Sequence, residues 1–150
     1  MTITDLSGRW EVCLDESKAD ALPQKYPDRI NLPDSTSNAG LGALNTEMEY
    51  GCLTDLHKFE GFAWFRREVE IIPEMSGKNL TLFLERTRKT RVYIDGNQIG
   101  EYCSLCTPHR YDLTGLPAGK HELIIRVDNT DYPTGGGHLT SRDTQTNWNG

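Results

Sequence analysis

The chain has 150 residues, of which 36% are hydrophobic and 25% are charged. This length suits one domain that buries about 70% of the surface its unfolded chain exposes, and the composition excludes disordered and fibrous proteins. The net charge of −6 and the lack of a Lys/Arg-rich run argue against a nucleic-acid partner. No stretch approaches the ~20 apolar residues of a membrane span, and no basic start precedes an apolar segment. We therefore expect a cytoplasmic protein without a membrane partner.

Alternating apolar and polar residues predict strands in the first half of the chain. GRWEVCL, at 8–14, alternates from its second residue, and FAWFRREVEII, at 62–72, alternates with a predicted slip near Arg66. The core-facing residues predicted here are Trp10, Val12, Leu14, Phe62, Trp64, Val69 and Ile71. Between these strands, residues 16–21 favour a single helical turn, and residues 32–45 form a long polar connection.

The second half of the chain continues the same alternation. NLTLFLER predicts a strand at 79–86, and TRVYIDGNQIGEY predicts a hairpin at 90–102 that turns at Asp95-Gly96. GKHELIIRVDN predicts a last strand at 119–129, before a Gly-rich tail. The residues predicted to face the core are Leu80, Leu82, Leu84, Val92, Ile94, Ile99, Leu123, Ile125 and Val127. Short strands separated by turn signals predict an all-β, antiparallel sandwich or jelly roll.

Several stretches, taken in chain order, resemble the N-terminal domain of family 2 glycoside hydrolases, and together they span about Leu6 to Gly150. They are LSGRWEVCLD, EGFAWFRREVEI, LFLERTRKTRVYIDGNQIGE, TPHRYDLTGLPAGKHELIIRVDN and GGHLTSRDTQTNWNG. The resemblance implies a single jelly-roll domain over 1–150 with a galactose-binding-like fold. It also implies a fragment of a longer enzyme, in which an immunoglobulin-like domain and a catalytic α/β barrel follow. The barrel would carry the two Glu residues of a retaining mechanism.

The resemblance places the segment 143–150 at the rim where this domain meets the barrel, beside the terminal sugar. Aligning the final Gly puts the family's acidic position at Thr144, so Asp143 is the nearest carboxylate. Flat rings cover the C–H faces of a pyranose and planar polar groups bind its hydroxyls. The tail residues assigned to the sugar on these grounds are His138, Asp143, Asn147 and Trp148. The alternative is a solvated linker whose tryptophan docks on a neighbouring domain.

A second candidate site lies in DLHKFEGFAW, at 55–64. Glu60 stands next to Gly61 at the start of a strand, where a loop can present the carboxylate to a ligand. Trp64 lies in the alternating part and is expected in the core rather than on a ligand. In TRKTR, at 87–91, two readings stay open for Arg88 and Arg91: they clamp carboxylates or hydroxyls, or they form a charged outer strand face.

The sequence predicts no metal, no cofactor and no catalysis by this chain alone. Cys103 and Cys106 form one Cys-x-x-Cys with His109 nearby, whereas a zinc site usually needs two such pairs. With Cys13 and Cys52, they are expected to be free thiols. No nucleophile, metalloprotease or phosphate-loop motif is present, and no carboxylates stand in a recognisable pair.

We therefore interpret the chain as a non-catalytic domain of a family 2 glycoside hydrolase of carbohydrate metabolism, most simply a β-galactosidase-like one, with a parent enzyme of the β-galactosidase or β-glucuronidase type. Its expected partners are the immunoglobulin-like and barrel domains and a β-galactoside or related β-glycoside. Two alternatives remain, a free-standing carbohydrate-binding module and a purely structural docking domain. Because NWNG reads as a polar loop rather than a paired strand, a sheet edge is expected to stay open. The isolated chain should then pair edge to edge as a homodimer or leave its last ~10 to 15 residues loose.

Overall fold

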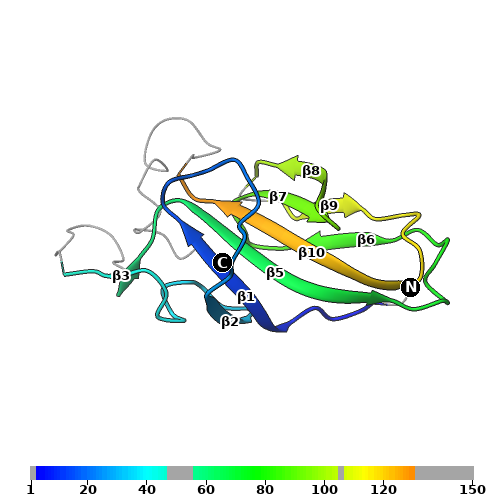
Figure 1. Cartoon of the computed structure of the whole chain (residues 1–150), viewed down its shortest axis with the longest axis horizontal. Helices are drawn as coiled ribbons and strands as arrows, with labels where there is room; N and C mark the ends of the chain where they lie inside the picture. Colours follow the sequence, from blue (N-terminus) through cyan, green and yellow to red (C-terminus); the bar gives the residue numbers. More distant parts are fainter. Residues whose placement is uncertain (1–2, 47–55, 105–106, 131–150) are drawn as a thin grey trace.

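The computed structural model describes residues 3–46, 56–104 and 107–130, and its regular elements in these ranges are all strands (Figure 1). They are β1 (Gly8–Asp15), β2 (Asp28–Leu32), β3 (Ala43–Leu44), β4 (His57–Lys58), β5 (Phe62–Ile71), β6 (Thr81–Leu84), β7 (Lys89–Ile94), β8 (Asn97–Tyr102), β9 (His109–Asp112) and β10 (Gly119–Asp128). One six-stranded antiparallel sheet has the order β2-β1-β5-β10-β7-β8, and β3-β4 and β6-β9 form two-stranded ribbons. This confirms the predicted all-β, antiparallel sandwich. No helix in the described ranges is long and apolar enough to cross a membrane.

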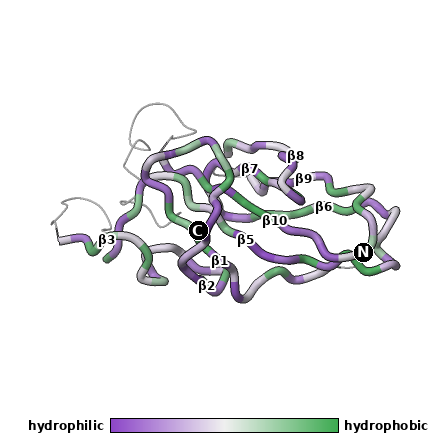
Figure 2. The backbone as a smooth tube through the Cα atoms, viewed as in Figure 1, coloured by the Kyte–Doolittle hydropathy of each residue, from purple (hydrophilic) through white to green (hydrophobic). Residues whose placement is uncertain are grey.

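The main core lies where the six-stranded sheet faces the β6–β9 ribbon. Figure 2 shows hydrophobic and hydrophilic residues interleaved along the long strands β5 and β10. The residues predicted from alternation that are buried in this core are Trp10, Val12, Leu82, Val92, Ile94, Leu123, Ile125 and Val127. Tyr111 of β9 joins them from the opposite layer. The period of two identifies these residues because one face of each strand packs on the other layer.

β5 is regular throughout, so the predicted slip near Arg66 is wrong. Its pairing with β10 runs over all ten residues of both strands without a register shift. Val69 packs against the main core, whereas Phe62 and Trp64 face the opposite side of the sheet. There they join a second apolar cluster that contains Tyr26, Tyr93 and Ile124. Because the start of β5 is covered on both faces, alternation alone could not assign its residues to one core.

The loop between β1 and β2 is a turn where a single helical turn was predicted at 16–21. The carboxylate of Asp15 accepts hydrogen bonds from the backbone N–H groups of Ser17 and Ala19, both at 2.9 Å. Lys18 has a φ of 55°, which no right-handed helix contains. The side chain of Asp15 therefore offers the backbone an alternative to helical hydrogen bonds.

The predicted hairpin between β7 and β8 is confirmed. Asp95 and Gly96 have φ values of 50° and 79°, as a type I′ turn requires at both central positions. Past the turn, a β-bulge leaves Ile99 without a partner on β7, because Gln98 and Gly100 flank it in the pairing register. Ile99 is 39% exposed, so the bulge ends the inward pattern that alternation predicted there.

Candidate functional site

Most residues that the sequence predicts to contact sugar lie outside the described part of the chain. These are His138, Asp143, Asn147 and Trp148, and their roles stay predictions. Glu60 is described, and it lies between β4 and β5 with its side chain exposed. Within the described ranges its carboxylate has no hydrogen bond or ion pair. The structure thus shows a solvent-facing carboxylate at a defined backbone position.

Asn129 fixes the backbone on both sides of Glu60. Its side-chain Nδ2 donates to the carbonyl oxygen of Phe59, and its Oδ1 accepts from the N–H of Gly61, each at 2.8 Å. The backbone N–H of Asn129 also donates to the carbonyl of Gly61 at 3.4 Å. Asn129 directly follows β10 and is only 6% exposed. We call residues Phe59–Gly61 the Glu60 turn.

The Glu60 turn packs against the main core and the end of β1. Phe59 is 4% exposed and belongs to the main core. A Cβ added to Gly61 would lie 2.4 Å from the carbonyl oxygen of Asp15 and 2.9 Å from the ring of Phe59. Only glycine therefore allows the turn to approach the end of β1 this closely. The side chain of Glu60 is exposed to solvent, while its backbone is anchored by the core and by Asn129.

A small cavity lies beneath the Glu60 turn. Its volume is about 10 Å³, which is room for one water molecule. The lining residues are Thr36, Phe59, Ala63, Phe65, Val127 and Asn129. A sugar ring does not fit in this space, so a ligand of Glu60 would bind on the surface of the domain.

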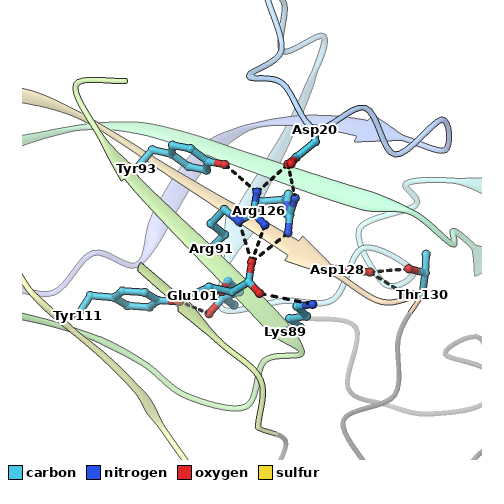
Figure 3. A network of polar contacts seen from close by, with 10 residues as sticks. Asp20, Lys89, Arg91, Tyr93, Glu101, Tyr111, Arg126, Asp128 and Thr130 are labelled. Carbon is cyan, nitrogen blue, oxygen red and sulfur yellow. Dashed lines mark hydrogen bonds and ion pairs between the residues drawn. The ribbon is translucent and has the colours of Figure 1, made fainter. Parts of the chain in front are cut away.

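A second polar site crosses the outer face of the six-stranded sheet (Figure 3). Arg126 of β10 lies directly opposite Arg91 of β7, and Arg91 lies opposite Glu101 of β8. Glu101 Oε2 accepts from Arg91 at 2.7 Å and from Arg126 at 3.5 Å, and its Oε1 lies 3.4 Å from Lys89 Nζ. Like charges opposite each other on neighbouring strands repel, and the carboxylate of Glu101 between Arg91 and Arg126 offsets this repulsion. We call Asp20, Lys89, Arg91, Glu101 and Arg126 the arginine cluster.

Asp20 closes the arginine cluster from the β1–β2 loop. Its Oδ1 lies 2.6 Å from Arg91 and 3.0 Å from Arg126. The side chain of Asp20 is 68% exposed, whereas that of Arg126 is 4% exposed. The guanidinium of Arg126 also stacks 4.1 Å from the centre of the Phe62 ring. The cluster therefore ties an exposed loop to the sheet above the second apolar cluster.

Within the arginine cluster, Arg91 and Glu101 keep each other ionised. Burial alone would lower the pKa of Arg91, but its hydrogen bonds with Tyr93 and Glu101 outweigh burial and raise that pKa. Burial alone would raise the pKa of Glu101, but the bonds and charges of Arg91 and Lys89 outweigh it and lower that pKa. A carboxylate held ionised in this way is a poor proton donor.

The same direction holds for the other described carboxylates whose pKa is displaced. The pKa is lowered at Asp5, Glu11, Asp95, Glu101 and Asp112. Glycoside hydrolysis needs a carboxyl group with a raised pKa as the general acid. The described carboxylates with displaced pKa values therefore stay ionised, as their ion pairs and their hydrogen bonds in turns require.

The two readings of TRKTR divide between its arginines. Arg91 lies on the outer face of the sheet, but it is bound within the arginine cluster and its side chain is only 19% exposed. Arg88 is 1% exposed and precedes β7. Trp64 is fully buried, as expected for a core residue. Arg91 therefore belongs to a charged outer strand face, as one reading proposed, whereas Arg88 is buried.

Sequence reasoning missed Arg126, Glu101 and Asp20 as members of one site. In LIIRVDN, Arg126 stands at an outward position of an apolar strand, which is a weak signal by itself. Only the pairing register brings it opposite Arg91. The position of Asp20 depends on the path of the β1–β2 loop, which has no sequence signature. Strand alternation therefore gave the face of most strand residues but not their neighbours on other strands.

The described cysteines are free thiols. Cys13 is partly buried and Cys103 is exposed, while Cys52 and Cys106 lie outside the described residues. No group of three or more His, Cys, Asp or Glu side chains in the described ranges is arranged to hold a metal ion. His109 instead bonds Thr90 Oγ1 at 2.5 Å and the carbonyl of Ser104 at 2.9 Å.

Comparison with known proteins gives one consistent likeness, and it is structural. No protein-family model and no curated protein matches the chain. Among solved structures, a β-glucuronidase of Faecalibacterium prausnitzii matches 84% of the chain with a TM-score of 0.62 and 23% identity. β-Glucuronidases of an uncultured Clostridium sp. and of Dictyoglomus thermophilum match 84% of the chain each, with TM-scores of 0.64 and 0.61 and identities of 20% and 19%.

The chain spans only about a fifth of the length of these enzymes. The matched part is 21% of the Faecalibacterium chain, 22% of the Clostridium chain and 19% of the Dictyoglomus chain. At these identities the likeness shows a shared fold. The chain therefore has the fold of one domain-sized part of several β-glucuronidases.

Proposed function

We propose that this chain is a non-catalytic domain of a family 2 glycoside hydrolase, which packs on the catalytic barrel and helps to form its sugar subsite. The observation that carries the proposal is the structural match of 84% of the chain to about a fifth of several β-glucuronidases. The family motifs in the sequence point the same way. Among the described carboxylates, those whose pKa is displaced have a lowered pKa, which is opposite to the raised pKa of a general acid.

The proposed ligand is a β-glycoside, either a galactoside or a glucuronide. The motifs favour a β-galactosidase-like enzyme, whereas the solved structures named above are β-glucuronidases. Structures of the Ruminococcus gnavus β-glucuronidase hold uronic deoxynojirimycin and uronic isofagomine. A test of this chain must therefore include both a neutral sugar and a uronic acid.

Calorimetry on the purified chain tests the proposal. The chain is titrated with galactose, glucuronic acid, mannose and a short β-linked oligosaccharide, and its folding is checked by circular dichroism. In parallel, 4-nitrophenyl β-glycosides are offered as substrates. We expect no hydrolysis, because the proposed catalytic carboxylates belong to the barrel. Hydrolysis that co-purifies with this chain would contradict a non-catalytic role.

The binding heats separate the two main alternatives. Binding tighter than about millimolar that is lost in Trp148→Ala would favour a free-standing carbohydrate-binding module. No heat from a folded chain would favour a subsite that the barrel must complete. Weak sugar contact, detected by the more sensitive titration described below, would count against the purely structural docking domain.

A further inference from the structure

We propose that Asn129 is a positioning residue that holds the carboxylate of Glu60 as a hydroxyl acceptor in a sugar subsite on the surface of the sandwich. This inference rests on the proposed function, and it assigns Glu60 as one residue of this domain that contacts the sugar. The site consists of the Glu60 turn and the residue that clamps it. It does not involve the arginine cluster.

The chemistry of the clamp selects an amide side chain. Asn129 must donate to the carbonyl of Phe59 and accept from the N–H of Gly61 at the same time, both at 2.8 Å. A carboxylate only accepts, and an ammonium or guanidinium only donates, whereas Asn and Gln do both. Asn129 has the shorter of these two side chains, and it also donates its own backbone N–H to the carbonyl of Gly61. The clamp therefore fixes the residues immediately before and after Glu60.

The clamp leaves the carboxylate of Glu60 available. Other carboxylates of this domain are already engaged: Glu11 with Arg66, Asp95 with His121, and Glu101 with Arg91. Glu60 has no such partner in the described ranges, so its lone pairs face solvent. A carboxylate can accept two hydroxyl protons, which is how vicinal hydroxyls of a sugar are bound. A fixed backbone reduces the entropy lost when such a contact forms.

In the sequence, Asn129 lies between the two stretches that are assigned to sugar. Asn129 follows β10 directly and precedes the segment that contains Asp143, Asn147 and Trp148. Its bonds to Phe59 and Gly61 join that point of the chain to Glu60, some 70 residues earlier. The tertiary structure thus brings Glu60 to the origin of the tail, which sequence spacing alone does not reveal.

Nuclear magnetic resonance titration of the ¹⁵N-labelled chain tests the inference. The probes are methyl β-D-galactoside and methyl β-D-glucuronide, at concentrations well above millimolar so that weak binding is seen. The variants are E60Q, N129D and the double variant, with E74Q as the matched control. Glu74 is an exposed carboxylate beyond the other end of β5. The amide signals of Gly61 and the side chain of Asn129 report on the site.

We expect the sugar to shift the Gly61 and Asn129 signals of the unaltered chain. E60Q should weaken binding about tenfold because a charge-assisted hydrogen bond is lost, and E74Q should bind like the unaltered chain. N129D should weaken binding by a similar factor, but only when Glu60 is present. The double variant should therefore bind like E60Q, since Asn129 acts through Glu60. A merely structural Asn129 would lower binding equally in both backgrounds.

The opposing outcomes separate this inference from the proposed function. Shifts that persist unchanged in E60Q would overturn the inference alone, because sugar then binds elsewhere on the domain. No shift with either sugar in a folded chain would overturn the inference that Glu60 binds sugar on this domain, whereas the proposed function would stand if the barrel must complete the subsite. If N129D does not fold, Glu60→Asp replaces it, since this variant retracts the carboxylate by one methylene. Binding by Glu60→Asp at full strength would then count against positioning.

Discussion

Arg91 and Arg126 lie directly opposite each other on neighbouring strands, and the same two carboxylates bridge both guanidinium groups. Glu101 bridges them from the sheet, and Asp20 bridges them from the β1–β2 loop. A ring of four alternating charges results. This ring, rather than a helical turn, holds the loop above Trp64 and Tyr93.

Asp20→Asn should loosen that loop. The substitution removes one of the two anions that neutralise Arg126, whose side chain is 4% exposed. We expect a loss of about 1–2 kcal/mol, more than a surface ion pair usually contributes, because the arginine stays buried. Urea unfolding followed by tryptophan fluorescence measures it. Glu74→Gln serves as the control, and equal midpoints for the two variants would count against the ring.

Gly61→Ala should destabilise the domain strongly. The added Cβ would meet the backbone oxygen of Asp15 at 2.4 Å, and backbone cannot move aside as a flexible side chain does. We expect a loss of about 2–3 kcal/mol in the free energy of unfolding. Gly100→Ala is the matched control, because its Cβ would only touch the Tyr111 ring at 3.4 Å. A Gly61→Ala protein as stable as Gly100→Ala would show that the turn is not tightly packed.

His121 should stabilise the domain at low pH. Its Nδ1 lies 2.6 Å from Asp95 Oδ2 and its Nε2 lies 2.9 Å from the carbonyl of Pro117, so the ring donates on both sides. The hydrogen bond with Asp95, followed by that with Pro117, raises the pKa of His121 above its usual 6.5. Its contribution is therefore complete below pH 6.5 and is lost as the pH rises through the folded-state pKa. Unfolding free energies of the unaltered chain and His121→Gln, measured across this range, should converge as the pH rises.

His109 should act in the opposite direction. Burial lowers the pKa of His109 below its usual 6.5, although the hydrogen bond to Ser104 opposes this effect. The unfolded chain then binds a proton that the folded chain does not, so stability falls as the pH drops below 6.5. The His109→Gln protein lacks this titration, and its stability should depend less on pH below pH 6.5. An identical pH dependence in both proteins would mean that His109 is protonated in the fold.

The two described thiols should differ in reactivity. Cys103 is exposed, whereas Cys13 is partly buried and burial, followed by the charges of Asp15 and Asp28, raises its pKa. Because the thiolate is the reactive form, iodoacetamide should label Cys103 faster than Cys13. Mass spectrometry of timed digests gives the two rates separately. Equal rates would indicate that the edge of β1 opens in solution.

The sequence by itself determined β1, β5, β6, β7, β8 and β10, the β7–β8 turn and the face of most core residues, whereas β2, β3, β4 and β9 were not predicted. Val92, Leu123 and Val127 could be placed because a sheet that packs on one side produces a period of two. Asp95-Gly96 could be placed because few residue pairs accept positive φ at both positions. These signals are local, so a single stretch contains all the information they need.

Only the tertiary structure decided which distant residues meet. Phe62 and Trp64 stand in an alternating apolar run, which predicts that they face the main core. They instead pack in the second apolar cluster on the opposite face of the sheet, since both faces of β5 are covered there. Arg126 meets Arg91, and Asn129 meets Gly61, through the pairing register and the loop connections. Those contacts arise when separate strands align to bury their shared apolar faces, and the alignment is a property of the whole sheet rather than of any one segment.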